Sequence, residues 1–312
     1  MSIVAVGALY VDTILTTLHC PEEDEKLRAS QISKRRGGNC PNTLEVMDQL
    51  ANASSQDLSM NLVTVLPARS SVASQQLLSD LEPRIRMGNC FYREGFEEPA
   101  SSYIIKSQAT GSRTIVNYNA LPEMEVAELI HVLDGLAPDT AWFHFEGRIP
   151  KILLACIEHL RKHFPSVRIS IEVERPGRAG LEDLARTANV VFYSKSWAIN
   201  KGYSSIETCL RAQCTQTPNA SLLLCTWGED GAGALEPDTG KFVHVAAYTR
   251  EGFEVIDPIG AGDTFIAGIL YALNCKDGEW DVFQKLSFAN RVAGIKVSQE
   301  GFSGLGRALH LE

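Results

Sequence analysis

Residues 257–265 read Asp257-Pro258-Ile259-Gly260-Ala261-Gly262-Asp263-Thr264-Phe265 and lead directly into an apolar helical pattern. The two glycines allow backbone conformations that bulkier residues resist, and the N–H groups of a helix start attract an anion. Asp263 beside such an anion pocket suggests phosphoryl transfer. Its carboxylate would accept a proton from an attacking hydroxyl while the N–H groups hold the phosphoryl group. The alternative is a helix cap, with the glycines serving a tight turn.

Short apolar runs alternate with helical patterns along the rest of the chain. The runs are nearly continuous, as expected for parallel strands covered on both faces, and this alternation predicts an α/β core with a mostly parallel sheet. The expected strands are Ile3–Leu9, Leu62–Leu66, Ala141–Phe145, Val167–Val173, Val190–Tyr193 and Leu222–Thr226. The expected helices are Cys40–Leu50, Val72–Leu81, Val126–Leu136, Ile149–His163, Ser205–Ala212, Gly262–Leu273 and about 281–298.

Two segments break this alternation, at about 13–33 and 101–119. Both show strand-like patterning without intervening helices, which predicts a small antiparallel β flap over one edge of the core. The alternative is a pair of extra edge strands without a role. We therefore expect one domain over 1–312, with the flap inserted into it.

A second glycine-containing segment, Arg36–Asn42, also precedes a helical pattern. Asn39 and Asn42 offer amides that both donate and accept hydrogen bonds, which suits a neutral polyol, although Asn39 could instead cap the helix. Asp12 follows the first strand, where parallel sheets bind ligands. His144 ends a buried strand and is expected to be a core histidine. Glu172 and Glu174 alternate on a strand end and are expected to project the same way, towards the nucleotide cleft or solvent.

Composition limits the classes of function. The 312 residues include 29 basic and 38 acidic ones, a formal charge of −9, which gives no general attraction to nucleic acid or anionic membranes. Eight scattered cysteines without a Cys-x-x-Cys pair predict ordinary thiols and no metal site. The sequence shows no signal peptide and no run of 18 apolar residues, so we expect a cytoplasmic protein.

Two common nucleotide signatures are absent from the sequence. No Gly-x-x-x-x-Gly-Lys-Ser/Thr occurs, and no Gly-x-Gly-x-x-Gly follows the first strand, which disfavours Walker-type ATPases and dinucleotide dehydrogenases. Residues 228–233 read Gly-Glu-Asp-Gly-Ala-Gly after the strand ending at Thr226. Their spacing fits a hairpin turn into 234–236 as well as it fits a nucleotide loop.

Several segments together resemble the PfkB family of sugar and nucleoside kinases, which has the ribokinase-like fold, and within it the ketohexokinase branch. Asp257–Asp263 resembles the carboxy-terminal signature of the family, and Gly37–Asn42 resembles its amino-terminal Gly-Gly-Asn element. The branch resemblance lies in Gly111–Ile115, His144–Arg148, Ile171–Pro176, Val190–Lys195, Leu224–Trp227 and Gly301-Phe302. The resemblance covers most of the chain in order and is weakest over 53–100.

The resemblance implies an ATP-dependent kinase with a three-layer α/β/α core and a small β lid, acting on a ketohexose such as fructose. It makes Asp263 the general base and the backbone of Gly260, Ala261 and Gly262 the anion hole. The implied sugar contacts are Asp12, Gly38, Asn39 and Asn42. The implied nucleotide contacts are Arg113, Gly228, Glu229, Asp230 and Gly231.

The resemblance also implies that magnesium is carried chiefly by the ATP phosphates, with few direct protein ligands. A potassium ion and a homodimer clasped through the lid are further implications of the family. Two departures stand out: Pro258 replaces the usual Thr, and Ser194-Lys195-Ser196-Trp197 stands where many relatives have Asn-x-x-Glu. The alternatives are a different acceptor, such as ribose or a nucleoside, and a sensor that binds nucleotide or sugar without catalysis.

Overall fold

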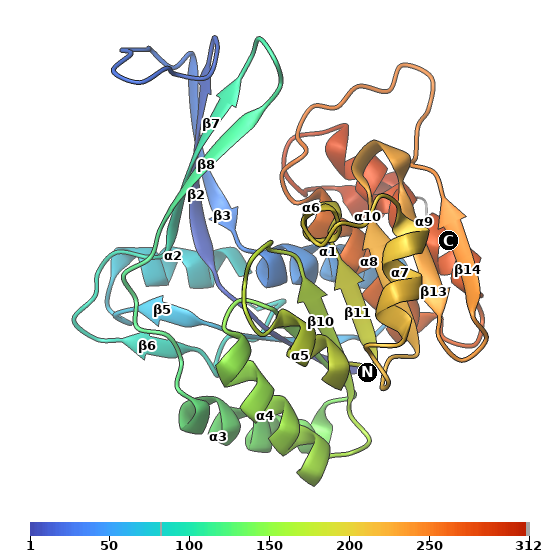
Figure 1. The fold of residues 1–312 in the computed structure, drawn as a ribbon. Helices are drawn as coiled ribbons and strands as arrows, with labels where there is room; N and C mark the ends of the chain where they lie inside the picture. The colour runs from blue at the N-terminus through green and yellow to red at the C-terminus, as the bar shows by residue number, and fades with distance from the viewer. Residues whose placement is uncertain (82, 310–312) are drawn as a thin grey trace.

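The computed structural model describes residues 1–81 and 83–309, and an eight-stranded sheet forms its centre (Figure 1). The strand order is β14-β13-β12-β11-β10-β9-β1-β4, and only the pairings of β12 with β13 and of β13 with β14 are antiparallel. The strands are β1 (Ser2–Val6), β4 (Ser59–Val63), β9 (Trp142–Glu146), β10 (Arg168–Val173), β11 (Val190–Tyr193), β12 (Leu222–Thr226), β13 (Ala232–Glu236) and β14 (Lys241–Val245).

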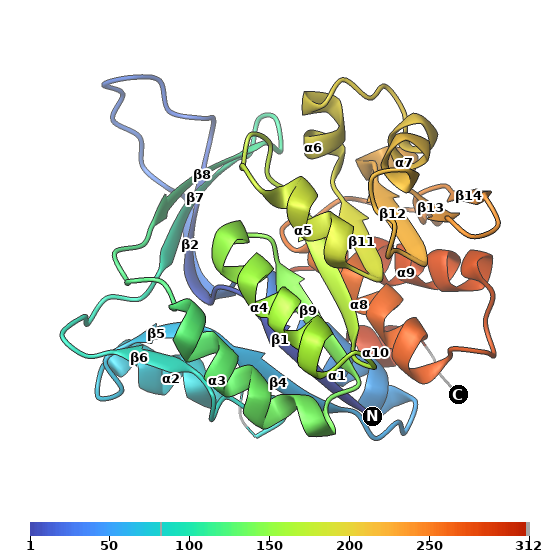
Figure 2. The same cartoon turned by 60° about the horizontal axis from the view of Figure 1, so that its bottom comes forward.

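Helices cover both faces of this sheet, which explains why its strands are almost continuously apolar (Figure 2). Two separate clusters of buried side chains mark the two faces. One face packs against α1 (Asn39–Ala53), α2 (Val72–Leu81), α8 (Ala261–Cys275), α9 (Val282–Val297) and α10 (Leu305–Ala308). The other packs against α3 (Val126–Leu136), α4 (Pro150–His163), α5 (Leu181–Thr187), α6 (Lys195–Asn200) and α7 (Ile206–Cys214). The predicted three-layer α/β/α core is confirmed.

A second, four-stranded sheet stands beside the core and is called the small sheet below (Figure 1). Its order is β3-β2-β7-β8, from β2 (Tyr10–Thr17), β3 (Gln31–Gly37), β7 (Ser101–Ser107) and β8 (Arg113–Tyr118). The pairing of β2 with β7 is parallel, whereas a purely antiparallel flap was expected. Strands β2 and β3 also extend beyond the expected range 13–33, so the small sheet includes Asp12.

Two expected strands are wrong in their bounds, and the first of them, β1, ends at Val6 and not at Leu9. The apolar run at 62–66 divides between β4, which ends at Val63, and β5 (Val65–Pro67), which pairs with β6 (Phe91–Arg93) in a separate two-stranded sheet. A continuous apolar run carries no mark of such a change of sheet. Helices α2 and α3 begin and end at the expected residues.

The topology locates the functional edge of the central sheet. The chain passes from β1 to β4 on one side and returns at β9 on the other side of β1, so the strand order reverses at β1. Ligands of open α/β sheets bind at the carboxyl ends of the strands beside such a reversal. Among the described residues, no helix is long and apolar enough to cross a membrane. All eight cysteines are described and are free thiols.

Candidate active site

A cavity of about 440 Å³ opens at this edge, between the small sheet and the start of α8. Nine of the thirteen predicted site residues line it: Asp12, Gly38, Asn39, Asn42, Arg113, Gly260, Ala261, Gly262 and Asp263. They come from β2, the start of α1, β8 and the start of α8, so the fold brings together all the predicted sugar, base and anion-hole residues. We call this space the main cavity.

The backbone before α8 requires a glycine. Gly260 precedes the helix with φ 80°, in the left-handed region, and a Cβ at this position would lie 2.3 Å from Cζ of Phe302. Ala261 N–H makes a 3.3 Å bond to the Pro258 carbonyl. The first N–H groups of the helix have no carbonyl within the helix to bond, and this leaves a positive helix terminus at the cavity wall.

Asp263 lies in the first turn of α8 and contacts α1. Asn42 Nδ2 donates to Asp263 Oδ2 at 2.7 Å, and Asn42 Oδ1 accepts from Arg36 Nη1 at 2.9 Å. Arg36 also pairs with Glu45. Because Arg36 can only donate, it fixes which end of the Asn42 amide faces Asp263. Arg36 was not predicted as a site residue, although it directly precedes the glycine segment.

The opposite wall of the cavity carries Asp12. Its carboxylate is buried on β2, within hydrogen-bonding range of Ser102 and close to Gly37, whose absent side chain leaves room for it. Burial raises the pKa of Asp12. Gly38 has φ 104°, and a Cβ there would lie 2.2 Å from the Ala8 carbonyl oxygen, so a glycine is needed where α1 approaches the end of β1.

Several carboxyl groups crowd the base of the cavity. Burial and the neighbouring Glu172 raise the pKa of Asp263 well above its usual range. Burial raises the pKa of Glu172 to about 8 and that of Glu146 to about 7, and the remaining carboxylates add to both shifts. Glu172 and Glu174 both accept hydrogen bonds from Asn39, which confirms that they project the same way. Perturbed carboxyl groups in a cleft are typical of an active site.

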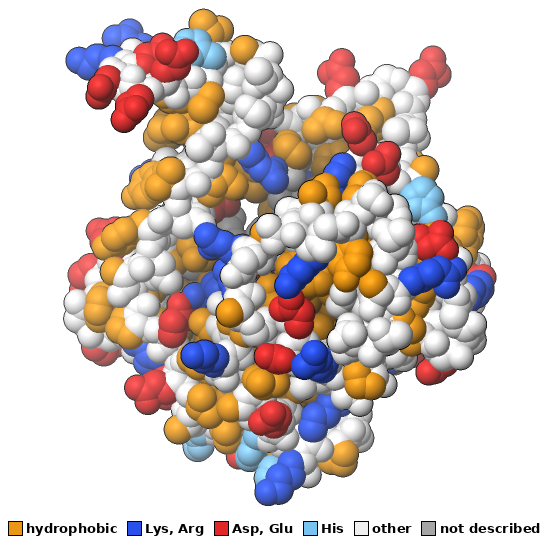
Figure 3. All heavy atoms as spheres, viewed as in Figure 1, with side chains coloured by type: hydrophobic (Ala, Val, Ile, Leu, Met, Phe, Trp, Pro, Cys, Tyr) orange, Lys and Arg blue, Asp and Glu red, His pale blue; other side chains and the backbone are white. Residues whose placement is uncertain are grey.

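Arginines balance this negative charge on the side of the cavity that faces the small sheet. Arg148, Arg175 and Arg178 line the main cavity together with the predicted Arg113. Arg148 is anchored by Glu123, and Arg178 Nη1 donates to the Gly147 carbonyl at 2.9 Å. Figure 3 shows Lys and Arg side chains beside the hollow between the small sheet and the core. The sequence did not predict Arg148, Arg175 and Arg178 as site residues, because single arginines in loops have no characteristic spacing.

A second cavity, of about 340 Å³, adjoins the main cavity through Pro258 and Ala261, which line both. Gly228, Glu229 and Gly231 line it, and apolar groups of Tyr248, Phe253, Val255, Ala293 and Val297 contribute to its walls. Asp230 does not line either cavity: its carbonyl accepts a hydrogen bond from His244 Nε2 at 2.8 Å. Of the two alternatives for residues 228–233, the hairpin is present, since β13 folds back antiparallel onto β12.

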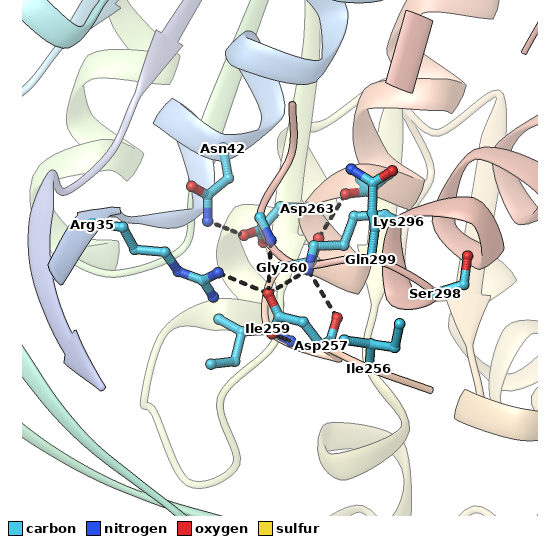
Figure 4. A network of polar contacts seen from close by, with 12 residues as sticks. Arg35, Asn42, Ile256, Asp257, Ile259, Gly260, Asp263, Lys296, Ser298 and Gln299 are labelled. Carbon is cyan, nitrogen blue, oxygen red and sulfur yellow. Dashed lines mark hydrogen bonds and ion pairs between the residues drawn. The ribbon is translucent and has the colours of Figure 1, made fainter. Parts of the chain in front are cut away.

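Asp257 holds the loop before α8 in place (Figure 4). Its Oδ2 accepts from Arg35 Nη1 at 2.7 Å and from Lys296 Nζ at 2.8 Å, and its carbonyl accepts from the same Nζ at 2.8 Å. Oδ1 accepts from the Ile259 N–H at 3.0 Å. Burial opposes ionisation, but the bonds from Arg35 and Lys296 outweigh it and hold the pKa of Asp257 well below its usual range. The buried ammonium of Lys296 thus occupies oxygens of Asp257, so these oxygens do not fit a potassium ion in addition.

The chain is similar to known carbohydrate kinases in sequence and in fold. The sequence matches the pfkB family carbohydrate kinase model over residues 1–305. It is 30% identical to ketohexokinase of Mus musculus over 311 residues, 97% of this chain and 98% of that protein. The structure superposes on a ribokinase from Thermotoga maritima with a TM-score of 0.75 and 17% identity, over 100% and 99% of the two chains. It also superposes on a ribokinase from Arabidopsis thaliana, solved in complex with ribose and ATP, with a TM-score of 0.71 and 16% identity, over 96% of this chain and 93% of that chain.

The core has the fold of ribokinases, and the start of α8 lies at the wall of its main cavity. The family model matches residues 1–305, nearly the whole chain, and this match assigns the protein to the ATP-dependent sugar kinases. The chain belongs to the pfkB family of carbohydrate kinases.

Proposed function

We propose that this kinase transfers the γ-phosphoryl group of ATP to the primary hydroxyl of a ketohexose, with fructose as the preferred acceptor. The observation that carries the proposal is the contact of Asp263 with Asn42 inside the main cavity, opposite Asp12 and beside Asn39. These groups offer carboxylates and amides to a neutral polyol. Identity of 30% with a mouse ketohexokinase over nearly both chains supports the choice of a ketohexose.

Asp263 is the general base in this proposal. The hydroxyl that attacks phosphorus gives its proton to a carboxylate oxygen of Asp263, and the raised pKa makes that oxygen a stronger proton acceptor than an ordinary carboxylate. Asn42 holds the carboxylate by one hydrogen bond at Oδ2. Asp12, Gly38 and Asn39 position the remaining hydroxyl groups of the sugar.

Charge on the transferred phosphoryl group is stabilised from two sides. The backbone N–H groups of Gly260 and Gly262 stabilise it from the helix terminus, where the dipole favours an anion, together with the N–H of Ala261, which also makes the 3.3 Å bond to the Pro258 carbonyl. Arg113 from β8 approaches the phosphates from the small sheet. Arg148, Arg175 and Arg178 give this wall additional positive charge.

The nucleotide occupies the second cavity, with its phosphates directed past Ala261 into the main cavity. Gly228, Glu229 and Gly231 border the base and ribose, and the apolar wall suits the flat face of adenine. Magnesium enters with the ATP phosphates, and the exposed carboxylate of Glu174 is placed to bind its water shell. No monovalent cation is assigned to Asp257, because Lys296 already bonds its oxygens.

The proposed assembly is a homodimer through the small sheet, and the proposed location is the cytoplasm. The face of the small sheet opposite the main cavity exposes Ile32, Tyr103, Val116 and Tyr118, of which 62%, 49%, 58% and 51% are accessible to solvent. Tyr103 pairs directly with Val116, and Tyr118 follows two residues later on the same face, so these three side chains form an apolar surface, with Ile32 on the same face at β3. A second copy of the same surface would cover it in a symmetric pair.

An acceptor panel tests the proposed substrate. ADP release with Mg-ATP is measured for ketohexoses, aldoses, polyols and nucleosides, and the product is identified by phosphorus NMR. We expect the highest kcat/KM with fructose and a phosphate ester at a primary carbon. Turnover with ribose or a nucleoside alone would retain the kinase and change the acceptor. ATP and sugar binding without any turnover would favour a sensor.

A further inference from the structure

A chain of buried hydrogen bonds joins the sheet interior to Asn39. It begins at Trp142 Nε1, which donates to Ser170 Oγ at 2.8 Å, and continues from Ser170 Oγ to His144 Nδ1 at 2.9 Å. His144 Nε2 then bonds Glu172 Oε1 at 3.0 Å. The four side chains alternate along the paired strands β9 and β10, and each is at most 3% exposed. This confirms His144 as a core histidine, yet its chain of bonds leads out to the main cavity.

The other oxygen of Glu172 contacts the cavity wall. Asn39 Nδ2 donates to Glu172 Oε2 at 2.7 Å and to Glu174 Oε2 at 2.9 Å. An amide nitrogen has two hydrogens, so both are used. The carbonyl oxygen Oδ1 is then the polar atom with which Asn39 meets a ligand in the main cavity.

The bond from His144 determines which oxygen of Glu172 can accept a hydrogen bond from Asn39. Burial keeps the pair neutral, since it lowers the pKa of His144 to about 3 and raises that of Glu172 to about 8. The single proton lies between Nε2 and Oε1, whichever of the two atoms holds it, so Oε2 always remains an acceptor. Without the imidazole, that proton can move to Oε2 and donate to Asn39 Oδ1 in the reversed amide, and Glu174 alone then holds Asn39 in its present orientation.

Other titratable groups around this chain do not compete for its bonds. Cys40 lies with its Sγ within 4.8 Å of the imidazole and carboxylate, but its thiol donates to the Val6 carbonyl, and burial raises its pKa well above the usual range. Glu146 accepts instead from the Ala8 N–H at 2.7 Å. Asp263 is bonded by Asn42.

We propose that His144 and Glu172 are positioning residues that lock the Asn39 amide with Oδ1 towards the sugar, so that Asn39 only accepts a hydrogen bond from one sugar hydroxyl. This inference rests on the proposed function, because it assigns Asn39 to the sugar. It predicts a specificity rule: one hydroxyl of the sugar must donate. A fluorine at the same carbon accepts weakly and cannot donate, so Asn39 would reject it.

The test measures sugar binding by calorimetry, with fructose and with derivatives in which fluorine replaces each secondary hydroxyl in turn. In the wild-type protein, fluorine at the position facing Asn39 should weaken binding about tenfold, the loss of one hydrogen bond. In His144→Leu the Asn39 amide can turn. The ratio of the Kd of this fluorinated sugar to the Kd of fructose should therefore fall to about twofold to threefold, while the same ratio for the other positions stays unchanged. His144→Gln keeps a polar group near Nε2 and should restore the wild-type ratio.

A second pair of variants covers the case in which His144→Leu does not fold. Glu172→Gln retains an oxygen for Asn39 and should keep the ratio, whereas Glu172→Leu should lose it. Each ratio compares two ligands of the same variant, so a general loss of stability cancels. If the ratio at the position facing Asn39 is the same in His144→Leu and Glu172→Leu as in the wild type, the proposed role of His144 and Glu172 is overturned. Sugar binding without phosphoryl transfer in the wild type would instead overturn the proposed function.

Discussion

Asn42 Nδ2 and Asp263 Oδ2 lie 2.7 Å apart although 221 positions separate the two residues in the chain. The bond joins the first turn of α1 to the first turn of α8, the two helix starts that each follow a glycine with positive φ. It links the proposed sugar-binding wall to the proposed base. Any change that turns the Asn42 amide would place its oxygen against the Asp263 carboxylate.

Arg36→Met tests this link. Removing the guanidinium frees the Asn42 amide to turn, and we expect kcat/KM for the sugar to fall about tenfold, the effect of one hydrogen bond. Glu45→Gln is the matched control, because it weakens the other contact of Arg36 and leaves Asn42 bonded. Steady-state kinetics at saturating ATP measure both. Equal losses in the two variants would contradict the orientation argument.

Two neighbouring glycines should respond differently to alanine. Gly260→Ala adds a side chain at positive φ and against Phe302, and we expect a loss of about 1 to 3 kcal/mol in the free energy of unfolding. At Gly262 a Cβ meets no atom within 4 Å, so Gly262→Ala should fold normally and raise KM for ATP by crowding the phosphate. Urea unfolding and kinetics separate the two effects. A Gly262→Ala protein with unchanged ATP kinetics would argue against phosphate binding there.

Asp257 should make stability depend on pH. Its pKa in the folded protein is lowered, so its contribution is present above the pKa of the unfolded chain and is lost as the pH falls through the folded value. Asp257→Asn leaves buried Lys296 without its counter-charge, and at pH 7 we expect a loss of about 3 to 5 kcal/mol, the cost of an unpaired buried charge. The difference from wild type should shrink in strong acid. A difference that does not change with pH would contradict this pairing.

A charged side chain on the exposed face of the small sheet should dissociate the proposed dimer. Val116→Lys places an ammonium in the middle of the apolar surface, and we expect a dimer to become a monomer in light scattering. Phe283→Lys, at an exposed apolar position of α9 and outside the small sheet, is the control. A monomeric wild-type protein would contradict the proposed assembly.

Much of the fold follows from the sequence because its strands are buried on both faces and therefore apolar throughout. Helices α2 and α3 match the expected bounds, whereas the run at 62–66 divides between two sheets, since apolar character does not reveal a change of partner. The glycine segment at 260–262 led to Asp263 because a helix start attracts an anion, and the segment at 36–42 led to Asn42 because its amide suits a neutral polyol.

Other parts of the site could not be predicted in this way. Arg35 and Lys296 reach Asp257 from β3 and α9, and their role depends on where two distant elements meet. Lysine in a helical pattern ordinarily indicates a solvated face, yet Lys296 is fully buried. His144 was correctly expected in the core, but its link to Asn39 requires the register of β9 on β10.

The most direct test of the central claim is ADP release from Mg-ATP with fructose, measured for the wild type and for Asp263→Asn. Removing a positioned base should lower kcat by about 100- to 10,000-fold. Fructose and ATP binding, followed by calorimetry, should stay within a few-fold of the wild type. Turnover by Asp263→Asn close to the wild-type rate would contradict the assignment of Asp263 as the base.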